Sequence, residues 1–408
     1  MARAPSSGGP VGRPIGLYAS EAPDDLVGAR LALAASVTRD LSRTEAVVAG
    51  VVVGSTALRR CSVRADLDLV VITPATQDGD RFSTRRVDGT LVEVERLGRD
   101  DALALTTGDG WVWELRNAAR LGTGIPVFDP DGFAGGLLAR AAAMVPSAAR
   151  YEDTLRGVYE TLIELAGPAG SEPGRRLDAL RGCLDNLALL ALLERPRRYQ
   201  KPKWVLADLL HAGEDDLVDA LLAAYGIADG PGGGRAAITP ARGLIDAAFG
   251  IAGAPTHDDL LAMGHAPDWA EVSYVSRTLD DAEDLAASGR AIEARYTALF
   301  AARLAAGLLG ATTGTAGATS GADADATSGD TTTATDGADA AGAGVVDVFA
   351  RHGLAERYLA LFPEPGTNDV DLLPAALAAA GDRRRALEAM VGTTRATAAP
   401  TGSATVRA

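Results

Sequence analysis

The chain has 408 residues, of which 47% are hydrophobic, so it is long enough for two or three domains with sizeable cores. Its net charge of −15 argues against a nucleic-acid backbone as the main partner but suits a cationic small molecule. Two cysteines are too few for a disulfide framework and no apolar run of about 18 residues would span a membrane, so we expect a reducing cytoplasm.

The first segment of the chain, residues 1–20, has Pro and Gly where a secretory signal would need an apolar core. We interpret it as a flexible arm. Apolar residues at helical spacing then predict a helix over 21–43, with Asp24 and Asp25 in its first turn, where the helix dipole favours acidic side chains. This helix opens the first predicted domain, residues 21–145.

The stretch after this helix organises the predicted domain. An apolar, β-branched run over 47–53 is typical of a buried strand, and it ends at Gly54 and Ser55. Asp66 and Asp68 then open a second apolar run. Residues two apart on a strand share a face, so these carboxylates lie close together and are costly unless a cation lies between them. Hard divalent cations with oxygen ligands, Mg²⁺ above all, fit such a pair.

A hairpin is predicted over residues 85–97, because Asp88-Gly89 is a turn signal between two strand-like runs. Glu93 and Glu95 alternate with valines on its returning strand, so both acids face the same side. Strand alternation alone leaves open which of the two lies nearer the aspartates.

In residue type and spacing this region resembles the nucleotidyltransferase superfamily, which contains DNA polymerase β and the antibiotic adenylyltransferases. The signature of that superfamily is a Gly-Ser turn, then about ten residues, then Asp-x-Asp inside an apolar strand. Gly54, Ser55, Asp66 and Asp68 match it. The resemblance is specific over residues 45–97 and looser elsewhere.

The resemblance implies an activity and a set of metal ligands. A hydroxyl would attack the α-phosphate of ATP or another nucleoside triphosphate, with two Mg²⁺ ions stabilising the attacking and leaving oxygens. Asp66 and Asp68 would hold both ions. The superfamily places a third carboxylate on the next strand, between an apolar residue and Val, which selects Glu93 to complete the metal site and leaves Glu95 as the alternative.

Strand patterns stop near residue 147, and helical patterns predict an all-helical second domain over 146–310. The predicted helices cover residues 149–165, 175–193, 204–210, 215–225, 240–252 and 268–309. Lys201 and Lys203, the only lysines in the chain, lie in a proline-containing loop before one of them. A similar loop in related adenylyltransferases faces the nucleotide phosphates, so the resemblance implies that Lys203 and Lys201 bind the triphosphate together with Gly54 and Ser55.

Residues 311–344 contain only Ala, Thr, Gly, Ser and Asp. Such a segment cannot bury enough apolar surface to offset its ordering entropy, so we predict a disordered linker. Helical patterns return over 345–395, which we expect to pack on the helical domain, and residues 396–408 are expected to form a tail.

The sequence therefore predicts the α+β class, with a small mixed-sheet nucleotidyltransferase domain followed by an all-α domain. The expected activity moves AMP from ATP to a hydroxyl of a small polar acceptor, such as an aminoglycoside-like molecule. One alternative is an enzyme that AMPylates a protein in a toxin–antitoxin pair, against which the chain length argues. Another is a non-catalytic nucleotide-binding relative, against which the three acidic residues argue. We expect neither a nucleic-acid nor a membrane partner, and the nucleotide, the acceptor and the oligomeric state stay open.

Overall fold

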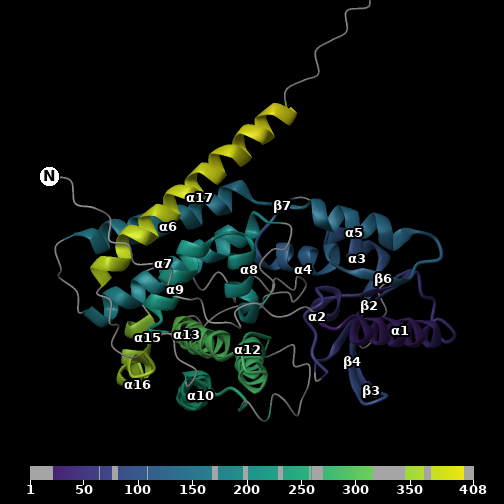
Figure 1. Cartoon of the computed structure of the whole chain (residues 1–408), viewed down its shortest axis with the longest axis horizontal. Helices are drawn as coiled ribbons and strands as arrows, with labels where there is room; N and C mark the ends of the chain where they lie inside the picture. Colours follow the sequence, from purple (N-terminus) through teal and green to yellow (C-terminus); the bar gives the residue numbers. More distant parts are fainter. Residues whose placement is uncertain are drawn as a thin grey trace, which may run out of the picture.

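The computed structural model has a sheet-containing N-terminal part followed by helices (Figure 1). It describes residues 22–63, 65–75, 81–107, 109–167, 173–195, 201–227, 233–256, 259, 270–315, 345–362 and 369–398. The predicted arm and most of the predicted low-complexity linker lie outside these residues. One small mixed sheet among many helices places the protein in the α+β class, as the sequence predicts.

Five strands form the main sheet, in the order β3-β4-β2-β1-β6. Their bounds are β1 Ala49–Val52, β2 Leu67–Thr73, β3 Phe82–Val87, β4 Thr90–Gly98 and β6 Ile125–Phe128. Strands β2 and β4 are parallel neighbours, whereas the other neighbouring pairs are antiparallel. A separate two-stranded parallel sheet joins β5, Asp109–Gly110, to β7, Val145–Pro146.

The predicted hairpin is present as β3 and β4, joined by Asp88 and Gly89. Both turn residues have positive φ, 47° and 79°. Two successive left-handed residues match the right-handed twist of paired strands, which is why Asp-Gly is favoured in two-residue hairpin turns. The Asp-Gly dipeptide therefore explains the connection between these two strands.

Alternating strand residues place apolar side chains on both faces of the main sheet. On one face, Leu69, Val71 and Val94 pack with buried residues of α1, Asp24–Leu41. On the other face, Val70 and its neighbours join a larger core that includes residues of two further helices. These helices are α4, Val112–Gly122, and α5, Phe133–Ala143. Strands β1 and β2 are buried on both faces except at Asp68 near the start of β2, whereas the edge strand β3 is mostly exposed.

The remaining helices form the body of the molecule to the left of the sheet in Figure 1. They are α6 Ala148–Ala166, α7 Pro173–Leu193, α8 Val205–His211, α9 Asp215–Ala224, α10 Gly233–Ala252, α12 Ala270–Ala287, α13 Ala291–Thr315, α15 Val345–Arg351, α16 Ala355–Leu359 and α17 Asp369–Ala398. The described part of the chain also contains the short helices α2 Gly54–Ala57, α3 Arg99–Ala104 and the 3₁₀ helix η1 Pro202–Trp204.

The helical pattern over 268–309 forms two helices, α12 and α13, rather than one. They are separated at Gly289, whose φ of 79° lies in the left-handed region that ends helices. Helix α13 runs on to Thr315, into the tract that the sequence predicts to be disordered. No helix in the described part of the chain is both long enough and apolar enough to cross a lipid bilayer.

A buried polar cluster connects helices inside the body. Arg303 on α13 forms ion pairs with Asp178 and Asp185, both on α7. Tyr358 donates a hydrogen bond to Asp178 at 2.6 Å, and Tyr225 donates one to Asp185 at 2.6 Å. The cluster therefore ties α7, α13 and α16 together through hydrogen-bonded charges.

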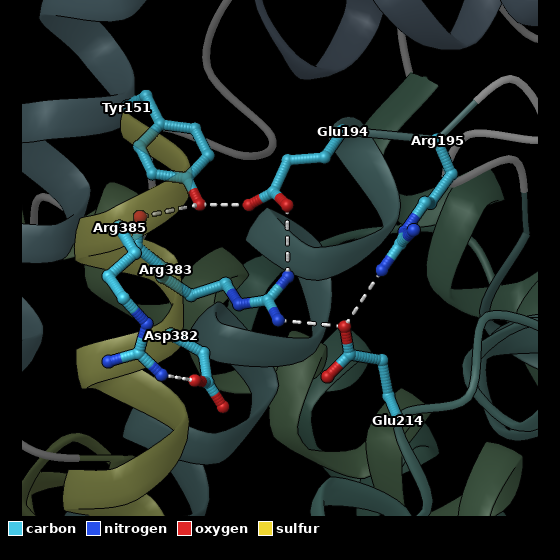
Figure 2. Close-up of polar contacts among 7 residues, drawn as sticks. All are labelled: Tyr151, Glu194, Arg195, Glu214, Asp382, Arg383 and Arg385. Carbon is cyan, nitrogen blue, oxygen red and sulfur yellow. Dashed lines mark hydrogen bonds and ion pairs between the residues drawn. The ribbon is translucent and has the colours of Figure 1, made fainter. Parts of the chain in front are cut away.

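The long helix α17 packs against α6, α7 and α9. Its Arg383 lies between two carboxylates, with Nη1 at 3.1 Å from Glu194 and Nη2 at 2.7 Å from Glu214 (Figure 2). The hydroxyl of Tyr151 donates a hydrogen bond to the other oxygen of Glu194. These contacts dock the C-terminal helix through one buried guanidinium.

Candidate functional site

Three carboxylates meet where β2 and β4 run side by side. Asp66 immediately precedes β2, Asp68 lies on it, and Glu93 lies on β4 directly across from Asp68. One oxygen atom from each residue can be chosen such that all three lie within 4.8 Å of one another. All three residues are partly exposed, so the cluster is open to a ligand. Within the described residues this is the one group of three or more His, Cys, Asp or Glu with such spacing.

The parallel register distinguishes the two glutamates that sequence alternation could not. Glu93 is level with Asp68, whereas Glu95 is two positions further along the same face. Glu95 is buried and forms ion pairs with Arg120 and with Arg81, the latter at 2.9 Å. Its two oxygens are therefore engaged by guanidinium groups, while Glu93 joins the acidic cluster.

The charges in this cluster perturb one another. Burial and the neighbouring Asp66 raise the pKa of Asp68, against an opposing effect of Lys201 and Arg120. Burial, Asp66 and Asp68 likewise raise the pKa of Glu93. Mutual repulsion makes it costly for all three carboxyl groups to be ionised at once. A divalent cation bound to their oxygens would make that ionised state favourable. The residues present thus fit a Mg²⁺ site.

The Gly-Ser turn lies directly against this cluster. Gly54 has a φ of +67°, and a Cβ added to it would overlap Oδ2 of Asp68. The amide of Val53 donates to the carbonyl of Asp68 at 3.0 Å, which fixes the turn beside the strand. The hydroxyls of Ser55 and Thr56 are buried, and neither forms a hydrogen bond with a described residue. Buried hydroxyls without partners are unusual in native proteins, and an anionic ligand beside Gly54 would satisfy them.

The two lysines lie around the ring of Trp204, which is buried. The ammonium of Lys201 is 5.9 Å and that of Lys203 is 5.5 Å from the ring centroid. Lys203 also forms an ion pair with Asp281 of α12. Burial opposes the charge on Lys201, but Asp281 and both aspartates of the Asp-x-Asp motif together raise its pKa. Lys201 therefore brings positive charge to the acidic cluster.

The loop is held against the N-terminal part by a residue that follows the Gly-Ser turn. Arg60 forms an ion pair with Asp208 of α8 at 2.6 Å, and both side chains are no more than 10% exposed. The same guanidinium lies 5.7 Å from the centroid of Trp204. Helices α8 and α12 lie on the side of the helical body nearest the sheet (Figure 1). Residues from both parts of the chain thus surround the cluster.

Several arginines near the cluster were missed by sequence reasoning. Arg120 on α4 forms an ion pair with Glu95 and opposes the rise in the pKa of Asp68, and Arg277 on α12 opposes the rise in the pKa of Glu93. Arg116, one turn before Arg120, lies 5.1 Å from the ring centroid of Tyr274 on α12. Their four-residue spacing on a predicted helix was a signal that Arg116 and Arg120 share a face, but nothing local indicated that this face meets the acids.

Comparisons with known proteins identify no family for this chain. No protein-family model matches it, and no curated protein matches it either. One similar solved structure is that of a nucleotidyltransferase-like protein from Exiguobacterium sibiricum 255-15, with a TM-score of 0.27 and 13% identity. The alignment covers 46% of this chain and 65% of that one, which is less than two thirds of its length. The likeness is too slight to assign a fold family, so the function is argued from the site itself.

Proposed function

We propose that the protein is a Mg²⁺-dependent nucleotidyltransferase. It transfers a nucleoside monophosphate, AMP from ATP, to a hydroxyl of a small polar acceptor such as an aminoglycoside-like molecule, and it releases pyrophosphate. The observation that carries the proposal is the convergence of Asp66, Asp68 and Glu93 beside a glycine turn with two buried hydroxyls that have no partner among the described residues. Acidic clusters on exposed surfaces are common, but one beside such a turn matches the needs of phosphoryl transfer.

The three carboxylates hold two Mg²⁺ ions in this proposal. When bound, these ions stabilise the charge that develops on the attacking and departing oxygens. The acceptor oxygen forms a bond to the α-phosphorus as the bond to the β-phosphate breaks and pyrophosphate departs. The hydroxyl proton moves to the carboxylate of Glu93, which lies on β4 directly across from Asp68.

The remaining residues around the cluster suit the two substrates. Main-chain groups at Gly54 and the hydroxyl of Ser55 receive the β- and γ-phosphates, because glycine allows the chain to approach them closely. Lys201 and Lys203 neutralise the triphosphate from the helical side. Arg120 adds a further positive charge near the carboxylate of Asp68.

The acidic residues of helix α12 favour a positively charged acceptor. Asp280, Asp281 and Asp284 lie on it, and burial together with the first two raises the pKa of Asp284. Asp66 also raises the pKa of Asp284, so these carboxylates lie near the acidic cluster. Accumulated negative charge of this kind attracts ammonium groups, and it agrees with the net charge of −15.

The test incubates the full chain with Mg²⁺, each of ATP, GTP, CTP and UTP labelled at the α-phosphate, and a panel of aminoglycoside and other polyhydroxylated acceptors. We expect acceptor-dependent pyrophosphate release and a labelled product with one nucleotide. Asp68→Asn is the control and should abolish both signals while the melting temperature is retained. Turnover by Asp68→Asn at the wild-type rate would contradict the proposed site, and label on the protein itself would favour protein AMPylation.

A further inference from the structure

The two aspartates of the Asp-x-Asp motif are held in place by different means. Asp68 lies inside the sheet, where its main chain pairs with Glu93 on one side and its carbonyl accepts from Val53 on the other. Asp66 precedes the strand, and the register of β2 with β4 begins only at Leu67. The sheet therefore positions Asp68 but leaves the main chain of Asp66 without a strand partner.

A buried arginine from the opposite layer supplies the missing contacts. Arg30 lies on α1 and is 3% exposed. Its Nη1 donates to the carbonyl of Asp66 at 2.7 Å, and its Nη2 donates to the carbonyls of Ser62 at 2.9 Å and Ala65 at 2.5 Å. One guanidinium thus holds three carbonyls of the segment that ends at Asp66.

The chemistry of these contacts suits a rigid support. Hydrogen bonds from a charged donor are stronger than those from a neutral donor, and a planar guanidinium fixes the directions of several donors at once. An ammonium group is a point charge on a flexible stem and cannot reproduce that fork. The three acceptors are neutral carbonyls, so the contacts fix the main chain at Ser62, Ala65 and Asp66 rather than neutralise an acid.

We propose that Arg30 is a positioning residue for the metal site, acting through the main chain of Asp66. The inference rests on the proposed function, because it assigns Arg30 a role in setting metal affinity. In metal sites, partners that orient a ligand typically account for about 10–100-fold in metal affinity. Arg30 extends the site to α1, on the face of the sheet opposite the carboxylates.

The test uses the full chain and Mn²⁺ alone as the probe, titrated by electron paramagnetic resonance. Arg30→Met keeps an unbranched apolar stem but removes the fork, and Arg30→Lys keeps the charge. Val37→Ala is the matched control, because Val37 lies on the same helix, is 2% exposed and packs against the strands. Melting temperature and amide hydrogen exchange over 62–67 are measured for every variant.

Arg30→Met is expected to weaken Mn²⁺ binding about 10-fold and to speed exchange at 65–67, with Arg30→Lys intermediate. Val37→Ala should lower the melting temperature without changing Mn²⁺ affinity.

Wild-type affinity in Arg30→Met, or in Arg30→Lys if the former does not fold, would overturn this inference and leave the proposed function standing. An equal loss of affinity in Val37→Ala would do the same. If the wild-type chain binds no Mn²⁺, or if Asp68→Asn binds it equally well, the metal site itself is wrong.

Discussion

A missing side chain allows the acidic cluster and the glycine turn to share one space. Gly54 adopts a left-handed φ of +67°, and Oδ2 of Asp68 occupies the position that a Cβ would take. Both the backbone conformation and the lack of space require glycine at position 54. The left-handed backbone conformation costs other residues about 1–2 kcal/mol, and a Cβ would also collide with Asp68, a proposed metal ligand.

We predict that Gly54→Ala reduces turnover at least 100-fold and lowers the melting temperature by several degrees. Gly89→Ala is the matched control, since Gly89 has a φ of +79° but open space where a Cβ would lie. It should cost only the backbone strain of about 1 kcal/mol and leave turnover unchanged. Thermal unfolding and pyrophosphate release measure both effects. Equal effects of the two substitutions would show that Asp68 moves aside freely.

The glutamates of β4 give the second prediction at this scale. Glu93→Gln should lose nearly all turnover but be no less stable, because burial, Asp66 and Asp68 already raise the pKa of Glu93 and the neutral amide relieves that repulsion. Glu95→Gln should retain far more activity yet be destabilised by about 1–3 kcal/mol, because Arg120 and Arg81 lose their charged partner. Turnover and chemical denaturation are measured for both variants. If Glu95→Gln lost turnover and Glu93→Gln lost stability, the roles of the two glutamates would be reversed.

At the residue scale the sequence indicated those site residues that have local signals. Strand alternation predicted that Asp66 and Asp68 meet, and the family resemblance placed Gly54 and Ser55 in the same site. The choice of Glu93 came from a resemblance, because alternation treats it and Glu95 alike. Strand register separates the two, and register depends on contacts between segments that are distant in sequence.

At the element scale, local signals predicted the strands and most helices but not their neighbours. The Asp-Gly turn explained why β3 and β4 pair. Nothing local showed that β4 would also lie parallel to β2, the pairing that brings Glu93 beside Asp68. Likewise, apolar periodicity ran continuously over 268–309, and it could not show that Gly289 would reverse the chain between α12 and α13.

Helix α17 provides a prediction about how an element is docked. Arg383→Met should destabilise the protein by about 3 kcal/mol, because Glu194 and Glu214 lose the guanidinium between them (Figure 2). Arg385→Met is the matched control: its ion pair with Asp382 is exposed, so the change should cost under about 0.5 kcal/mol. Urea denaturation of each variant measures these values. Similar values for the two arginines would mean that apolar contacts alone dock the helix.

On the scale of the whole molecule, the proposed site is assembled from two parts that the sequence could describe only separately. Composition predicted a strongly acidic protein, yet the residues around the cluster include Lys201, Arg120 and Arg277. The contact of Arg60 with Asp208 and Trp204 joins those parts. Such contacts cross long distances in sequence, and arginine is too frequent in this chain for any single one to be noticed.

The pH dependence of global stability tests the buried cluster inside the helical body. Burial raises the pKa of Asp185 to about 6 from 3.8, against the opposing effects of Arg303 and of hydrogen bonds from Tyr225 and Tyr296. The folded state therefore holds a proton that the unfolded state has released between these two values. Stability from this group is fully present below pH 3.8 and is lost as the pH rises to about 6.

We predict that wild-type stability falls relative to Asp185→Asn by roughly 2–3 kcal/mol between pH 4 and pH 7, because the amide cannot ionise. The difference in stability between the two proteins cancels the pH-dependent contributions of other buried acids, such as Glu293 and Glu194, whose pKa values burial also raises. Denaturant unfolding at steps of half a pH unit gives both curves. A flat difference would mean that Arg303 compensates the charge of Asp185 fully, and the cluster would then be a permanently ionised pair. A difference that rises with pH would reverse the sign, and would show that ionised Asp185 strengthens the contacts between α7 and α13.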